Sequence, residues 1–286
     1  MRKVALFFSL WLFTGTTIVF AQQQSHKVTF KVTVAAETKS SFIPTGRLFI
    51  FLVAYPGREP RTCSPTSYSV IGFAKNLSNF NTEATYIIDS DDGWMKWQST
   101  SFLSYEDEEM VLKIIKDFSF KNIPEGQYRV QVLWDQDNTE SSINAPGNIF
   151  SKVHEVVIDQ SQEVQISLSE IIDQRELVQH NLAREINYRS DTLSKWWEKE
   201  VIVKASVLLP GKYLEDKNVT YPICYYVSGY GGRYTRINNL INDENFMDWW
   251  VSEEAPQIII VFLDGEGPFG DCYQMDSEIN GPFGYN

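Results

Sequence analysis

The segment "PEGQYRVQVLWDQD" (residues 124–137) sets the pattern for the first half of the chain. Pro124, Glu125 and Gly126 are turn residues. After them, apolar side chains occupy every second position, at Tyr128, Val130, Val132 and Trp134. A period of two places these side chains on one face, so the segment predicts a β-strand with one buried side.

The same alternation recurs on both sides of this segment. It is found in "KVTFKVTVAAE" (27–37) and "HEVVIDQSQEVQISL" (154–168), whereas "GRLFIFLVAY" (46–55) is more continuously apolar. Short strands separated by turn residues are typical of a β-sandwich. We therefore predict an all-β, immunoglobulin-like sandwich over residues 22–168. Residues 169–199 read as a linker or lead-in, with either an amphipathic helix or a strand entering near residues 184–188.

The pattern changes after residue 200. The apolar runs "YPICYYV" (221–227) and "PQIIIVFLDG" (256–265) flank a helical stretch for which Asp243 is the expected N-cap. A buried strand, a glycine loop, a helix and a second buried strand are the sequence of elements in a parallel sheet. Residues 200–286 thus predict the first part of a three-layer α/β/α domain with an incomplete sheet. Cys224, inside an apolar run, is expected in the core.

The start of the chain predicts export. A basic beginning is followed by an apolar run to Phe20 and a small residue at Ala21, which is typical of a signal peptide over residues 1–21. Cleavage near Ala21 would deliver the protein to the periplasm or the extracellular space. The chain has 25 Lys and Arg against 37 Asp and Glu, a net charge of −12. Nucleic acid and, after signal removal, membrane are therefore not expected partners. No zinc motif is present, and we expect neither metal nor cofactor.

Two loops follow the apolar runs of the second half. Gly229–Gly232 and Asp264–Gly270 both lie where the carboxyl ends of strands are expected, and ligands bind at these ends in open α/β sheets. Spacing alone leaves two interpretations of the glycine loop, a tight turn that leads into a helix or part of a site.

A resemblance adds to this interpretation. "ASVLLPGKYLEDKNVTYPICYYVSGYGG" (205–232) and "PQIIIVFLDGEGPFGDCYQMDSEINGPFGYN" (256–286) resemble secreted α/β-hydrolase esterases of the esterase D or enterochelin-esterase type. The resemblance is specific after Ala205 and weaker before it. It implies a serine esterase acting on an ester of unknown identity. Its backbone oxyanion-hole candidates are Gly229, Tyr230 and Gly231, and Asp264, Asn280 and Gly281 lie in a possible active-site loop.

The catalytic residues that this family uses are missing from the sequence. The chain has no G-x-S-x-G elbow, and His26, His154 and His180 all precede the hydrolase-like segment. Ser228 also stands where the family commonly has histidine. The chain stops at Asn286, before an elbow would occur, so we expect no catalytic residue here and no ester hydrolysis by this chain alone.

The alternative function is an exported β-sandwich module that binds a glycan or a protein, with a vestigial hydrolase segment after it. Trp94 and Trp97, or Trp196 and Trp197, could form a platform for a sugar ring, although packing in a core is their commoner role. The carboxylates among residues 264–278 could act as a pair in glycoside hydrolysis, but a solvated acidic loop explains them more simply. "DQDNTE" (135–140) resembles the start of a calcium loop and is expected to be a turn.

Overall fold

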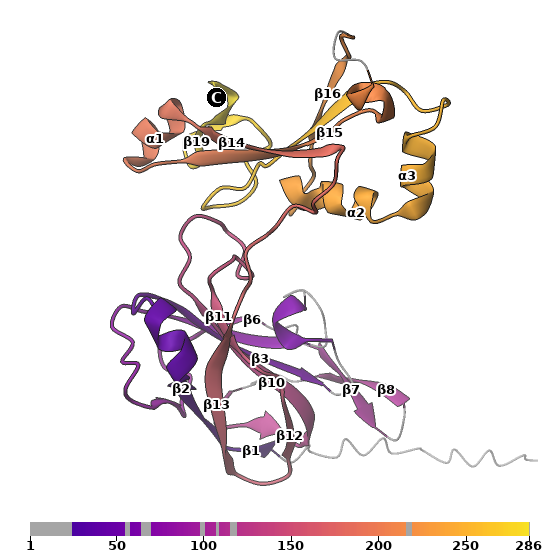
Figure 1. The fold of residues 1–286 in the computed structure, drawn as a ribbon. Helices are drawn as coiled ribbons and strands as arrows, with labels where there is room; N and C mark the ends of the chain where they lie inside the picture. The colour runs from indigo at the N-terminus through magenta and orange to yellow at the C-terminus, as the bar shows by residue number, and fades with distance from the viewer. Residues whose placement is uncertain are drawn as a thin grey trace, which may run out of the picture.

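The computed structural model describes residues 25–54, 58–63, 70–97, 101–106, 109–114, 119–215 and 219–285. The predicted signal peptide, residues 1–21, lies outside these ranges. Two β-rich halves, joined by the stretch after residue 171, make up the described chain (Figure 1). No helix in the described part of the chain is both long and apolar enough to cross a bilayer.

Nine of the described strands form one sheet in the N-terminal half, with the order β5-β2-β13-β11-β10-β3-β4-β6 and β12 paired to β10. These strands are β2 (Val28–Val34), β3 (Gly46–Ala54), β4 (Val70–Leu77), β5 (Tyr86–Ile88), β6 (Met95–Trp97), β10 (Gly126–Asp135), β11 (Ile149–Ser151), β12 (His154–Ile158) and β13 (Gln162–Ile171). Two-stranded ribbons are formed by β1 (Ser25–His26) with β9 (Ile123–Pro124) and by β7 (Ser101–Glu106) with β8 (Glu109–Ile114). The short 3-10 turns are η1 (Ala36–Ser41) and η2 (Pro60–Thr62).

The core of this half lies inside the curl of the sheet. The even-numbered residues of β2, and those of β10 from Tyr128 on, are buried there, as the alternation predicts. They pack with the inner faces of β3, β4, β12 and β13. Trp134 is fully buried in this core, where its ring stacks on Phe42. The strands predicted around residues 28–34 and 126–135 are thus confirmed.

The predicted immunoglobulin-like sandwich of two separate sheets is wrong. Strand β13 pairs in parallel with β2 through residues 162–168, and its last residues, from Leu168 on, pair antiparallel with β11. It therefore joins the two halves of the expected sandwich by hydrogen bonds, and the strands form one curled sheet.

The C-terminal half contains a four-stranded sheet of order β14-β15-β17-β16. Its strands are β14 (Ala183–Arg189), β15 (Ile202–Leu208), β16 (Ile223–Val227) and β17 (Ile259–Leu263). The helices are α1 (Asp191–Trp197), α2 (Ile237–Ile241) and α3 (Glu244–Trp250), with 3-10 turns η3 (Gly211–Leu214), η4 (Tyr234–Arg236) and η5 (Phe283–Tyr285). A small ribbon pairs β18 (Asp276–Ser277) with β19 (Gly281–Pro282). The segment near residues 184–188, for which helix and strand were both open, is thus a strand.

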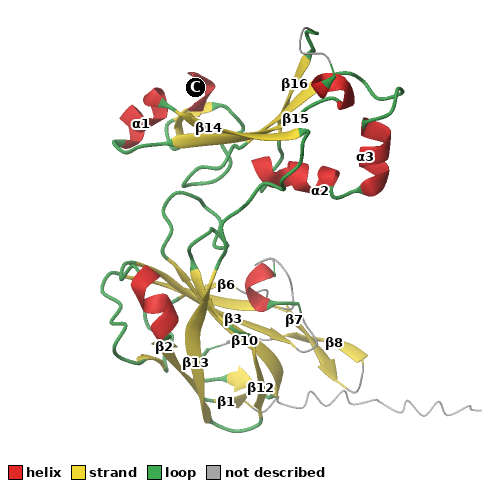
Figure 2. Cartoon of the chain, in the orientation of Figure 1, coloured by secondary structure: helices red, strands yellow, loops and turns green. Residues whose placement is uncertain are grey.

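The predicted three-layer α/β/α domain is also wrong. Only β16 and β17 are parallel, and β14, β15 and β17 pair antiparallel. The helices of this half are short (Figure 2). One face of the sheet packs against α2 and α3, while Ile223, Tyr225 and Val227 are exposed on the other. The sheet therefore lacks the second helical layer in the described chain.

Of two predictions for single residues in this half, one is confirmed and one is wrong. The Asp243 side chain accepts a hydrogen bond from the Phe246 backbone N–H, so the predicted N-cap of α3 is confirmed. The expectation that Cys224 lies in the core is wrong, because β16 is an edge strand and its Cys224 is exposed. All three cysteines are free thiols.

The stability of the fold should depend on pH through Asp135, the last residue of β10. Burial raises the pKa of Asp135 to about 6, although its carboxylate accepts a hydrogen bond of 2.7 Å from the Asn148 amide. Because the folded-state pKa lies above the ordinary value of 3.8, the stabilising contribution of the protonated form is present below pH 4 and is lost as the pH rises through 6.

We therefore expect Asp135→Asn to gain stability relative to the wild type as the pH rises from 4 to 7. Urea denaturation at the two pH values measures this difference. Asp159→Asn, a change in an exposed turn, is the matched control and should leave the difference unchanged. An Asp135→Asn protein that gains nothing between pH 4 and pH 7 would contradict the prediction.

Candidate functional site

The glycine loop after β16 packs against the segment after β17. The backbone N–H of Gly231 donates a hydrogen bond of 2.7 Å to the Asp271 carboxylate, and Tyr230 is 90% exposed. A void of about 10 Å³ lies between Ser228, Gly232 and residues 263–274. This space holds at most one water molecule. The N–H that could bind an oxyanion thus already binds a carboxylate of the same chain.

Arg233 connects this loop to two buried carboxylates. It forms an ion pair with Glu266 and another of 2.9 Å with Asp271. The three side chains are 12%, 7% and 7% exposed, respectively. These two carboxylates do not form the solvated acidic loop expected from the sequence. Their buried charges require a cation, and the guanidinium group supplies it.

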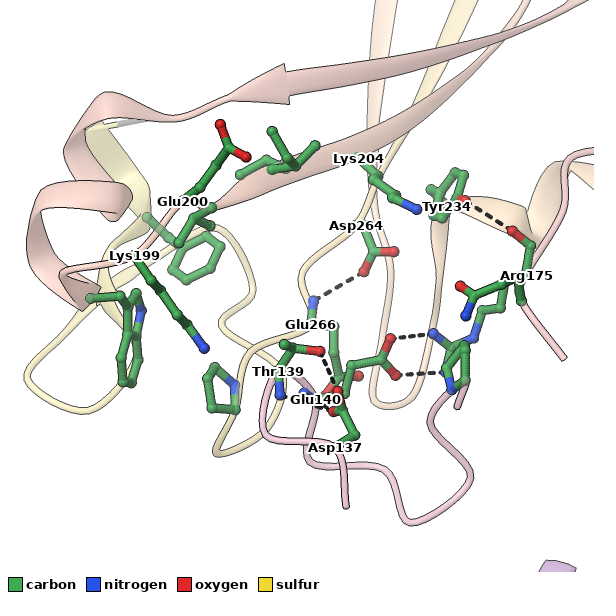
Figure 3. A pocket seen from close by; sticks show the side chains of 18 residues that line it. Asp137, Thr139, Glu140, Arg175, Lys199, Glu200, Lys204, Tyr234, Asp264 and Glu266 are labelled. Carbon is green, nitrogen blue, oxygen red and sulfur yellow. Dashed lines mark hydrogen bonds and ion pairs between the residues drawn. The ribbon is translucent and has the colours of Figure 1, made fainter. Parts of the chain in front are cut away.

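A cavity of about 480 Å³ lies between the two halves of the chain. The N-terminal half contributes the turn of residues 137–140 and Pro146, and the joining stretch contributes Gln174 and Arg175. The C-terminal half contributes residues from positions 197–204, Tyr234, the start of the loop after β17, and Phe283. Figure 3 shows charged side chains from all three parts around one space. We call this space the domain cleft.

Polar contacts link the two halves beside the domain cleft. Glu266 accepts two hydrogen bonds of 3.0 Å, from the Ser141 backbone N–H and from its hydroxyl. Arg175 binds Glu140 through both carboxylate oxygens. Burial opposes the charge of Arg175, but the contacts with Glu140 outweigh it and raise its pKa. Bidentate pairs of this kind fix geometry as well as charge.

Asp264 and Tyr234 lie on the wall of the domain cleft. Burial raises the pKa of Asp264, while the charge of Arg233 and a backbone hydrogen bond from Tyr234 act against that shift. Burial also raises the pKa of Tyr234 to about 12, and the neighbouring Glu185 carboxylate adds to the effect. The phenol therefore stays neutral at physiological pH.

Trp197 offers the domain cleft an aromatic surface. Its indole N–H donates a hydrogen bond of 3.3 Å to the backbone oxygen of Asn280, and its ring lies 6.0 Å from that of Phe269. The backbone of Gly281 has a φ of +93°, and a Cβ there would lie 2.8 Å from the Trp196 ring. Asn280 and Gly281, expected in an active-site loop, thus support the two tryptophans, and Asp264 from the same set lines the cleft.

The other sequence-based candidates lie elsewhere. Trp94 packs edge-on against Phe120 at the core of the N-terminal half, and the Trp97 side chain lies outside the described part. The "DQDNTE" turn is confirmed, because Asp137 accepts hydrogen bonds from the backbone N–H groups of Thr139 and Glu140. The described residues contain no group of three potential metal ligands.

No described hydrogen bond joins a histidine ring to a serine hydroxyl. His26 contacts Glu125, and the ring of His180 accepts from the Leu182 backbone N–H. Serine, histidine and cysteine are also absent from the described lining of the domain cleft. The described hydrogen bonds therefore contain no Ser–His pair of the kind used in acyl transfer.

Comparison with known proteins adds no family. The chain matches no family model. It also matches none of the curated proteins with which it was compared. The function must therefore be inferred from the residues of the domain cleft and from the motifs of the sequence.

Sequence reasoning missed most of the charged residues of this region. Arg175 and Lys204 belong to no motif, and the motif that contains Glu140 indicated only a turn. The three residues meet because the two halves pack at the domain cleft. Arg233 directly follows the glycine loop, so its position was a usable signal. A cation next to two acidic loop residues is needed once those residues are buried.

Proposed function

We propose that the protein is an exported, non-hydrolytic glycan-binding protein and that its ligand occupies the domain cleft. The observation that carries this proposal is the combination of the Trp197 ring with hydrogen-bonding side chains in one cavity of about 480 Å³. Small-molecule sites have this size and combine apolar surface with a few placed polar groups. A sugar has an apolar C–H face and polar edges, which match an aromatic ring bordered by carboxylate and ammonium groups.

Isothermal titration of the whole protein with tetrasaccharides tests this proposal. The probes are cellotetraose, xylotetraose, chitotetraose, galactotetraose and tetragalacturonate. We expect at least one of them to bind and Trp197→Ala to weaken that binding at least roughly tenfold, because the substitution removes the apolar surface that the sugar would bury. Trp249→Ala, on the exposed side of α3 and away from the domain cleft, is the control and should bind normally. Failure of all five probes to bind at millimolar concentration would overturn the proposal.

The esterase that the motifs imply is the second candidate. The glycine loop after β16 favours it, since its backbone N–H groups are suited to an acyl oxyanion, although the Gly231 N–H donates to the Asp271 carboxylate in this structure. Without a Ser-His pair among the described residues, we expect this chain to show no turnover of p-nitrophenyl acetate above that of a Gly231→Ala variant. Turnover that a serine-directed phosphonate titrates stoichiometrically would show that the chain is an esterase.

A further inference from the structure

The domain cleft contains charges of both signs, but its acidic groups are largely engaged. Glu140 is paired with Arg175, and Glu266 is paired with Arg233. Glu200 forms an ion pair with Arg189. The oxygens of Asp137 accept hydrogen bonds within its own turn. Asp264 accepts a hydrogen bond from the Glu266 backbone, and burial favours its neutral form.

Two lysines of the domain cleft, unlike its paired Arg175, form no ion pair within the described residues. Lys204 forms no ion pair within the described chain, and its ammonium group lies 5.6 Å from the Tyr234 ring centre. Lys199 has one long hydrogen bond, 3.4 Å to the Asn138 amide oxygen, and lies 6.0 Å from the Trp197 ring centre. In Figure 3 the two ammonium groups appear on either side of Asp264. Lys199 and Lys204 thus offer a ligand two ammonium groups that have no carboxylate partner in the part of the chain that the structure describes.

The net negative charge of the whole chain does not prevent an anionic group from binding to these two lysines. At physiological ionic strength, charges more than about 8 Å apart in solvent are largely screened. A ligand inside the domain cleft is affected mainly by the groups that line it. A lysine ammonium group donates up to three hydrogen bonds, and a bound carboxylate is the partner that also neutralises its charge.

We propose that the domain cleft selects acidic glycans, a short chain of uronic acid units whose carboxylates bind Lys199 and Lys204. One sugar ring then lies on Trp197, and Asp264 accepts a hydrogen bond from a ring hydroxyl. Two separated ammonium groups fit a ligand with repeated negative charges better than a single small anion. This inference rests on the proposed glycan-binding function and names its ligand class.

Paired titrations of the whole protein with tetragalacturonate and galactotetraose test the inference. These two chains differ chiefly in the carboxylate that replaces each hydroxymethyl group. We expect tetragalacturonate to bind roughly 10- to 100-fold more tightly, as charge-assisted hydrogen bonds predict. Raising the salt concentration to 0.5 M should reduce this preference.

Variants of single lysines test whether Lys199 and Lys204 cause the preference for the acidic chain. Lys204→Met and Lys199→Met should each lower the affinity for tetragalacturonate roughly tenfold and lower that for galactotetraose by a smaller factor, because only the acidic chain loses a charge-assisted hydrogen bond. Lys195→Met, which removes an exposed lysine of α1 that does not line the domain cleft, should change neither. A loss in the Lys195 variant equal to that in the Lys204 variant would indicate a diffuse surface effect and overturn the inference.

Other outcomes separate the inference from the function on which it rests. Equal binding of the two tetrasaccharides, lost in Trp197→Ala, would overturn the acidic preference and support glycan binding. If neither tetragalacturonate nor galactotetraose binds but another tetrasaccharide does, the acidic preference is again overturned and glycan binding is supported. Failure of all five probes would overturn both proposals.

Discussion

Replacing Arg233 by methionine should lower the unfolding free energy by about 3–5 kcal/mol at pH 7, the usual cost of removing one partner from a buried ion pair. Glu266 and Asp271 would remain 7% exposed without their cation. Two buried carboxylates without a cation would oppose folding. Urea denaturation at pH 7, monitored by tryptophan fluorescence, measures the loss.

The Arg233 prediction has a control and a rescue. Arg236→Met removes an exposed arginine three residues away that lies 5.4 Å from the Tyr226 ring, and it should change the stability by no more than about 0.5 kcal/mol. Adding Glu266→Gln and Asp271→Asn to Arg233→Met should recover most of the loss, because no uncompensated buried charge then remains. A triple variant as unstable as Arg233→Met would show that packing, rather than charge, explains the effect.

Replacing Trp134 by alanine should destabilise the N-terminal half by about 3–5 kcal/mol, the range for a large aromatic residue removed from a core. The Trp134 ring stacks on Phe42 at 5.2 Å and lies 5.2 Å from Phe80. Its indole N–H donates a 2.9 Å hydrogen bond to the backbone oxygen of Ile43. The substitution leaves a cavity and removes the donor for that oxygen, and both effects lower stability.

Ile87→Ala is the matched control in the same sheet, since Ile87 is 56% exposed on strand β5. Its effect should stay near the ±0.5 kcal/mol typical of surface positions. Thermal and urea denaturation of the whole protein should show the difference in the transition of the N-terminal half. A Trp134→Ala protein that is as stable as Ile87→Ala would contradict the placement of Trp134 in the core.

The proposed ligand site and the stability of the fold share one residue, Glu266. Its carboxylate contacts both Arg233 of the C-terminal half and Ser141 of the N-terminal half, at the border of the domain cleft. Loss of Arg233 therefore affects the link between the halves as well as the fold. Ligand affinity in that variant is a less direct readout than in the Lys204 and Trp197 variants.

The sequence alone determined the local structure of this protein. Alternation at Tyr128, Val130 and Val132 identified a strand and its buried face, and Asp243 identified the start of α3. These features depend on neighbours within a few residues, because side chains alternate across a strand and a cap bonds the first turn of its own helix. The same information did not show that β13 would join two expected sheets into one.

Only the tertiary structure decided which charges meet. Glu140 and Arg175 are 35 residues apart in sequence, and Arg233 and Asp271 are 38 apart, yet both pairs are in contact. The stretch "CYYVSGYGGRY" (224–234), which contains the glycine loop, shows the same division. Its glycines predicted a backbone turn from the sequence. Its contact with Asp271 and the edge position of β16 could be seen only in the folded chain. Distant pairings depend on the packing of the whole chain, and no local period in the sequence encodes them.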